Sequence, residues 1–255
     1  MSGWRAKLDV FLGDFEHMDD LSGVLVCGSY ITGNPTSRSD LDVHIILDNR
    51  VDYRQRGNRI IDGLMIEYFA NPPKQILRYF EEDIRDNALM SQVQFATGEI
   101  ILDKTGEAAT LKEKALLMIE DFYQKDRASS MDENTKYGLW DQRDNLRDAY
   151  ETNRPDFDFL YFNFLNKMIE TYMKSINRPY GIQAILGNIS DDSVRQKYLL
   201  RKLPDGEIGE LITKAITAVD RDKKLEAYEN LTAKILDKFG GFRVDGFKFK
   251  GGLEV

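Results

Sequence analysis

The stretch from Cys27 to Leu47 reads CGSYITGNPTSRSDLDVHIIL and places charged side chains at the start of an apolar run. It begins with the pair Gly28-Ser29 and continues through a polar loop of ten residues. The chain then returns to an apolar segment in which Asp40 and Asp42 are separated by one residue. An aspartate in such a segment is costly unless it faces water, a partner or a metal. The two aspartates therefore indicate a functional site.

Two strands are expected around this loop. The sequence GVLVC, residues 23–27, is short and apolar and predicts a buried strand that ends at Gly28. The segment LDVHIIL, residues 41–47, alternates between apolar residues on one face and Asp42 with His44 on the other. Positions i and i+2 of a strand point to the same side, so the carboxylates of Asp40 and Asp42 should converge.

A hairpin is expected between residues 58 and 73, where the sequence reads NRIIDGLMIEYFANPP. Asp62-Gly63 is a favoured turn pair, and Pro72-Pro73 ends the second arm. Glu67 lies in the middle of that arm and can add a third carboxylate. Three hard oxygen donors next to a glycine turn suit Mg²⁺ with a nucleoside triphosphate.

The rest of the chain is mainly helical in pattern. Helical spacing is expected near residues 4–15 and 76–84, and a short strand within residues 98–107. Further candidate helices cover 107–124, 134–151, 157–176, 193–203, 209–219 and 224–239. Residues 240–255 alternate weakly and fit a terminal strand or a frayed tail. The expected fold class is α+β, with a small mixed-sheet domain at 1–105 and an all-α helical bundle at 106–255.

The charge, the cysteine count and the lengths of the apolar runs disfavour several classes of protein. The 255 residues carry a net charge of −8 and a sequence pI near 5.0, which disfavours a general nucleic-acid binder. One cysteine excludes an internal disulfide and fits a reducing cytosol. The N-terminus does not resemble a signal peptide, and no apolar run reaches the roughly 20 residues that cross a bilayer. We expect a cytoplasmic protein without membrane partners.

The pattern Gly28-Ser29, ten residues, then Asp40-Leu41-Asp42-Val43 resembles the signature of the DNA polymerase β-like nucleotidyltransferase superfamily. Glu67 in LMIEYF is similar to its third carboxylate. The motif covers about forty residues. A helical domain after ILDKTGE gives a layout that resembles kanamycin nucleotidyltransferase and its relatives.

The resemblance implies a reaction and a set of roles. A hydroxyl of an acceptor attacks the α-phosphorus of a nucleoside triphosphate, ATP first among the candidates, and pyrophosphate leaves. Asp40, Asp42 and Glu67 would hold Mg²⁺, as two ions, while Ser29 with the backbone around Gly28 would hold the β- and γ-phosphates.

The resemblance also implies roles for residues outside the three carboxylates. Arg38 could reach the triphosphate from its loop. The general base would be a carboxylate of the helical domain, with Asp144 preferred and Asp141 second among acids that share one predicted helix face. Relatives that build the site across two subunits make a homodimer an open alternative.

Three functions remain open at this stage. The first is modification of a small molecule, such as an aminoglycoside-like antibiotic, which would connect the protein to antibiotic resistance. The second is a nucleotidyltransferase that acts on a protein or RNA partner, as in toxin–antitoxin pairs. The third is a nucleotide-binding protein that has lost catalysis, against which the intact Gly28, Ser29, Asp40, Asp42 and Glu67 argue.

Overall fold

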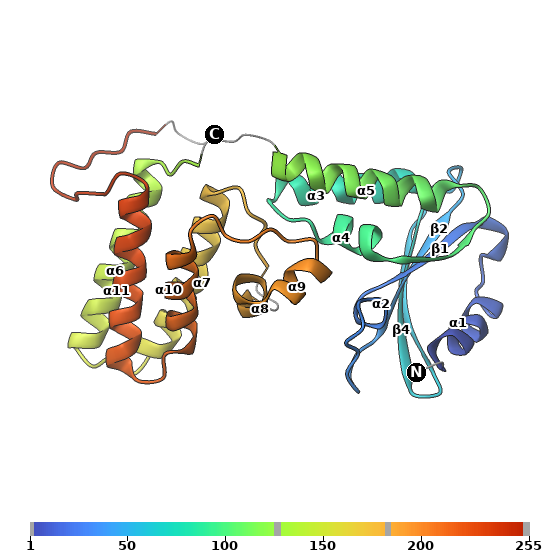
Figure 1. The fold of residues 1–255 in the computed structure, drawn as a ribbon, viewed down its shortest axis with the longest axis horizontal. Helices are drawn as coiled ribbons and strands as arrows, with labels where there is room; N and C mark the ends of the chain where they lie inside the picture. Colours follow the sequence, from blue (N-terminus) through green and yellow to red (C-terminus); the bar gives the residue numbers. More distant parts are fainter. Residues whose placement is uncertain (1–2, 125–128, 182–184, 252–255) are drawn as a thin grey trace. The chain divides into compact units, whose positions relative to one another are not determined.

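The computed structural model describes residues 3–124, 129–181 and 185–251 and shows an α+β protein. The chain forms two compact units, which are described separately below. Unit 1 comprises Met1–Lys125 with Lys197–Leu199, and unit 2 comprises Asp126–Gln196 with Leu200–Val255. Unit 1 contains the sheet and unit 2 is helical (Figure 1). Within the described part of the chain, no helix is both long enough and apolar enough to cross a membrane.

Unit 1 is built on a five-stranded mixed sheet with the order β3-β4-β2-β1-β5. The central strand β2 pairs in antiparallel fashion with β1 and in parallel fashion with β4, while β3 and β5 form the edges. The strand bounds are β1 (Leu21–Cys27), β2 (Leu41–Leu47), β3 (Gln55–Ile61), β4 (Leu64–Asn71) and β5 (Glu99–Asp103). Asp62 and Gly63 form the β3–β4 turn with φ of 45° and 78°, as the Asp-Gly pair predicts.

The two faces of the sheet bury alternate residues of the same strands. On one face, helix α1 (Gly3–Gly13) places Leu8 and Phe11 against a core that includes Val24 and Val26 of β1. The opposite face buries Leu25 and Cys27 of β1 in a second core beneath helices α3 (Pro73–Arg85), α4 (Met90–Thr97) and α5 (Glu107–Gln124). Figure 1 shows α1 on one side of the sheet and these helices on the other. Alternate residues of these strands thus pack in two different cores, one on each face of the sheet.

Helix α5 belongs to unit 1, so the units divide about twenty residues later than the expected boundary at 105 and 106. The helix has an apolar stripe, and that stripe joins the core beneath Leu25. Its buried residues are Ala108, Leu111, Ala115, Ile119 and Phe122. A helical pattern alone does not show which core a helix joins, because an amphipathic stripe fits any apolar surface.

Unit 2 is dominated by four long helices, α6 (Glu133–Glu151), α7 (Phe157–Ser175), α10 (Gly206–Thr217) and α11 (Arg221–Lys238), which run alongside one another (Figure 1). Three of them begin with an aspartate cap whose carboxylate accepts a backbone N–H, namely Asp132, Asp205 and Asp220. Such caps satisfy a backbone donor that has no partner inside the helix. The core contains three fully buried tyrosines, Tyr161, Tyr172 and Tyr228.

Two expectations for the helical half need correction. The helix expected over residues 193–203 is the short α9 (Asp192–Lys197), which is followed by Leu199 with a φ of 53°. A positive φ at leucine is incompatible with a continued helix. The structure also contains α8 (Ile185–Ser190), which the sequence pattern did not predict.

The structure describes the expected C-terminal strand or tail as far as residue 251, and residues 252–255 lie outside the described residues. Over residues 240–251 the described chain has no strand. The ring of Phe247 stacks on Tyr137 of α6 with centroids 4.8 Å apart. Phe242 and Phe247 of this segment thus pack against Tyr137 of α6, whereas Val244 and Phe249 are exposed.

Candidate metal and nucleotide site

Three carboxylates converge at one end of the sheet in unit 1. In the parallel pairing of β2 with β4, Asp42 lies directly opposite Glu67, and Asp40 precedes β2 by one residue. One oxygen from each of Asp40, Asp42 and Glu67 lies within 4.8 Å of the others. We call this group the acidic triad. The sequence predicted this convergence, and the geometry suits a hard cation that takes oxygen ligands.

The turn after β1 brings the backbone directly against the triad. Gly28 has φ 74° and ψ −158°, a conformation that is almost exclusive to glycine. A Cβ atom at this position would lie 2.1 Å from Asp42 Oδ2. Glycine is therefore required both by the backbone conformation and by the space that the Asp42 carboxylate occupies.

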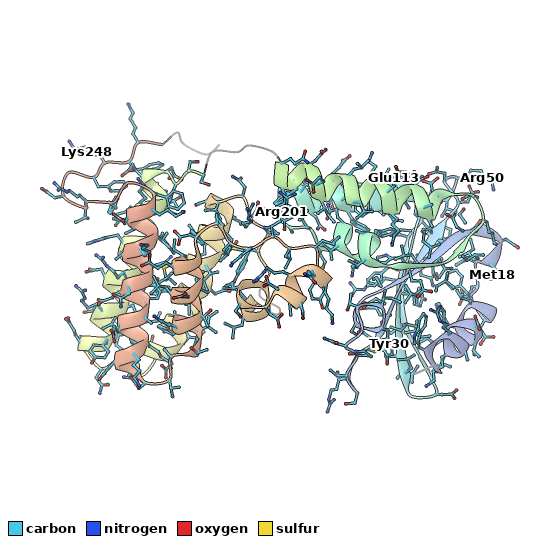
Figure 2. All side chains as sticks on the ribbon, in the orientation of Figure 1. Met18, Tyr30, Arg50, Glu113, Arg201 and Lys248 are labelled. Carbon is cyan, nitrogen blue, oxygen red and sulfur yellow. The ribbon has the colours of Figure 1, made fainter. Side chains whose placement is uncertain are left out.

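A short helix, α2 (Ser29–Thr32), follows this glycine and contains Tyr30, which is labelled in Figure 2. The amides of Ile31 and Thr32 bond back to Gly28 O at 3.1 and 3.0 Å. The amides of Ser29 and Tyr30 have no acceptor among the described residues. The first amides of α2 thus have no partner within the helix, and they directly follow the glycine whose backbone lies against the Asp42 carboxylate.

The triad is electrostatically strained without a cation. Burial, followed by the charges of Asp40 and Glu67, raises the pKa of Asp42 from 3.8 to about 6. The same aspartates contribute, after burial, to a raised pKa of the neighbouring Cys27 thiol. Repulsion between converging carboxylates is relieved when a cation binds them. The donor set, its spacing and this repulsion together fit a divalent metal ion.

Arg56 of β3 contacts the triad and was not identified from the sequence. Its Nη2 atom donates to Glu67 Oε1 at 2.7 Å, and the guanidinium lies 4.8 Å from the ring centroid of Phe69. Counting pairs back from the turn at Asp62-Gly63 places Arg56 opposite Phe69 and diagonal to Glu67. The hairpin expected from the sequence begins at Asn58, and Arg56 lies two residues before it, opposite Phe69.

His44 lies on the same face of β2 as Asp42 but is buried beneath helix α4. Its ring stacks on Phe69 at 5.3 Å and contacts Phe95 at 4.7 Å, and its Nε2 atom lies 3.3 Å from Gln94 Oε1. The side chain is therefore part of the core under the site. This core role depends on helix α4, which the sequence pattern does not predict.

We expect His44 to stay neutral down to about pH 4, because burial lowers its pKa from 6.5 to about 4. The folded pKa lies below the unfolded value, so the unfolded state binds the proton first as the pH falls. The stability that neutral His44 contributes is present above pH 6.5 and is lost towards pH 4, by at most about 3 kcal/mol.

An NMR titration can test this because the chain has only two histidines. A His17→Gln variant assigns the two imidazole signals. The remaining signal should titrate near pH 4, and a midpoint above pH 6 would contradict the burial of His44.

The other predicted residues are placed as follows. Arg38 is exposed in the loop after α2, where its backbone N–H donates to Thr36 Oγ1 at 3.2 Å. Asp141 and Asp144 lie on α6 of unit 2, and Asp141 Oδ2 accepts from Asn145 at 3.1 Å. Asp144 is exposed. The nucleotide-binding role of Arg38 and the catalytic roles of Asp141 and Asp144 stay predictions.

The chain was compared with known proteins. No protein-family model matches it, and no curated protein matches it. Among solved structures, a nucleotidyltransferase-like protein from Exiguobacterium sibiricum matches with a TM-score of 0.43 at 10% sequence identity. That match covers 93% of this chain and 77% of the other chain. The functional interpretation accordingly rests on the residues of the site.

Proposed function

We propose that this protein is a Mg²⁺-dependent nucleotidyltransferase that moves a nucleoside monophosphate, AMP from ATP, to a hydroxyl of an acceptor. The observation that carries the proposal is the acidic triad beside the free amides of Ser29 and Tyr30. The spacing of Gly28-Ser29 and Asp40-Leu41-Asp42-Val43, which resembles the DNA polymerase β-like signature, supports the same reaction.

The acidic triad would hold the metal. Asp40, Asp42 and Glu67 offer carboxylate oxygens, and we propose that they bind two Mg²⁺ ions. When bound, Mg²⁺ would activate the attacking oxygen and stabilise the leaving pyrophosphate. The protein's own contribution is to hold three like charges together before the metal arrives, at the cost reflected in the raised pKa of Asp42.

The turn at Gly28 would hold the triphosphate. The amides of Ser29 and Tyr30 and the Ser29 hydroxyl are donors for β- and γ-phosphate oxygens, with Arg38 as a further contact from the loop. These contacts fix the α-phosphorus for attack by the acceptor hydroxyl. The new bond joins that oxygen to the α-phosphorus, and the bond to the bridging oxygen breaks as pyrophosphate leaves with the electron pair.

The proton of the acceptor hydroxyl needs a base. We propose Asp144 of α6, with Asp141 as the second candidate. A small amino-alcohol acceptor agrees with the net charge of −8, because an acidic protein attracts cations.

We expect pyrophosphate release when the protein is incubated with Mg²⁺, ATP and a panel of amino-alcohol acceptors that includes aminoglycosides. Matched reactions without acceptor and with EDTA serve as controls, and mass spectrometry of the acceptor should find an added nucleoside monophosphate. The signal should require both the metal and one particular acceptor.

Other outcomes separate the alternatives. An added nucleotide on a co-purifying protein or RNA would move the reaction to a macromolecular acceptor. Binding of Mg²⁺-ATP without transfer to any acceptor would favour a protein that has lost catalysis. Absence of nucleotide binding in the presence of Mg²⁺ would contradict the proposed function altogether.

A further inference from the structure

Arg56 provides the basic side chain that contacts the acidic triad within the described residues. Its ion pair with Glu67 measures 2.7 Å between Nη2 and Oε1. The Arg56 side chain is 69% exposed, whereas that of Glu67 is only 19% exposed. The guanidinium is thus held at one corner by Glu67 of the acidic triad and is accessible to solvent at the others.

The ion pair and a metal ion compete for the same carboxylate. A divalent cation held by Asp40, Asp42 and Glu67 places like charge beside the guanidinium of Arg56, which weakens its attraction to Glu67. In the protein without a metal, by contrast, Arg56 offsets one charge of a triad that repels itself. Arg56 is therefore attracted to Glu67 when no metal is bound, and a bound metal weakens that attraction.

We propose that Arg56 changes partners when the site is loaded, leaving Glu67 and binding a phosphate oxygen of the nucleoside triphosphate. This inference rests on the proposed function of the site. A guanidinium presents five N–H donors in a planar fork that matches phosphate. Phe69 lies 4.8 Å beneath the guanidinium and can support it through a cation–π contact in either state.

A purely supporting role for Arg56 predicts the opposite change in metal affinity when Arg56 is removed. If Arg56 only orients Glu67 as a metal ligand, its removal should weaken metal binding, as loss of a supporting hydrogen bond usually does. If Arg56 competes with the metal, its removal should strengthen binding of the metal alone. The two interpretations are therefore distinguishable without measuring activity.

The test titrates Mn²⁺ alone, followed by electron paramagnetic resonance, and then Mg²⁺ with a non-hydrolysable ATP analogue, followed by calorimetry. For Arg56→Ala we expect the Kd for Mn²⁺ to fall about threefold, since an exposed ion pair is a weak competitor. The Kd for the nucleotide should rise about tenfold, because a charge-assisted contact to phosphate is lost.

A matched control lies on the same strand. Arg59 also forms an ion pair of 2.7 Å, with Asp14 just after the end of α1, on the opposite face of the sheet. Arg59→Ala should leave both dissociation constants unchanged. Arg56→Lys keeps the charge without the fork and should bind the nucleotide with intermediate affinity, and thermal unfolding shows whether each variant is folded.

Each outcome has a separate meaning. An Arg56→Ala protein with unchanged nucleotide affinity, or with weaker Mn²⁺ binding, overturns the exchange and leaves the proposed function intact. A wild-type protein that binds Mn²⁺ but no nucleoside triphosphate overturns the proposed function, and the exchange with it.

Discussion

Asp42→Asn should abolish metal-dependent nucleotide transfer and at the same time make the folded protein more stable at neutral pH. The amide keeps the size of the side chain but supplies one neutral oxygen where the metal needs a carboxylate. Loss of several kcal/mol of transition-state stabilisation corresponds to a fall in rate of about 10³-fold or more. The rate of pyrophosphate release measures this effect.

The gain in stability follows from the sign of the pKa shift. The pKa of Asp42 in the folded protein is about 6, above the ordinary 3.8, so ionisation of this group opposes folding. Stability is lost as the pH rises from about 4 to about 6 and stays lost above that. The shift corresponds to about 3 kcal/mol, which partial solvent exposure reduces to about 1 kcal/mol.

Urea denaturation without metal at pH 8 and at pH 4 tests this second effect. The variant should be more stable than the wild type at pH 8, and the difference should disappear at pH 4. Asp48→Asn, just after the end of β2 and partly exposed to solvent, is the control and should transfer nucleotide normally. If Asp42→Asn transfers nucleotide at a near-normal rate, the metal assignment is wrong.

The sequence predicted the parts of the site that depend on local patterns. Alternation in β2 put Asp42 on a defined face, and the turn at Asp62-Gly63 defined the hairpin that carries Glu67. The approach of Asp42 and Glu67 depends on how the hairpin joins the sheet. Its second strand, β4, pairs in parallel with β2, while its first strand, β3, forms the edge. The sequence indicates this approach only through chemistry, because the three carboxylates together can bind a metal ion.

The missed features depend on tertiary packing. Helix α4, with the sequence MSQVQFAT, has no strong amphipathic pattern, yet Phe95 within it packs on His44. The role of Arg56 required a register that continues two residues beyond the expected arm. Each of these contacts joins elements whose own residues give no local signal, so pattern analysis of one segment cannot reveal them.

Gly28→Ala should have a large effect on stability, and it tests the geometry of the turn directly. The methyl group would lie 2.1 Å from Asp42 Oδ2 at a backbone φ of 74°. The backbone conformation costs about 1–3 kcal/mol for a residue other than glycine, and the overpacking costs a similar amount. We therefore expect the free energy of unfolding to fall by about 3–5 kcal/mol, and Mn²⁺ binding to weaken at least about tenfold because the Asp42 carboxylate is displaced.

Gly33→Ala provides the matched control for this substitution. Gly33 also has a positive φ, 90°, but a Cβ atom there would have no neighbour within 4 Å. Its replacement should cost only about 1–2 kcal/mol and leave Mn²⁺ binding unchanged. In the double variant Gly28→Ala/Asp42→Ala the clashing oxygen is gone, so about 1–3 kcal/mol of the lost stability should return. If urea denaturation shows strictly additive effects for the two substitutions, the contact between the Gly28 backbone and the Asp42 carboxylate does not shape the site.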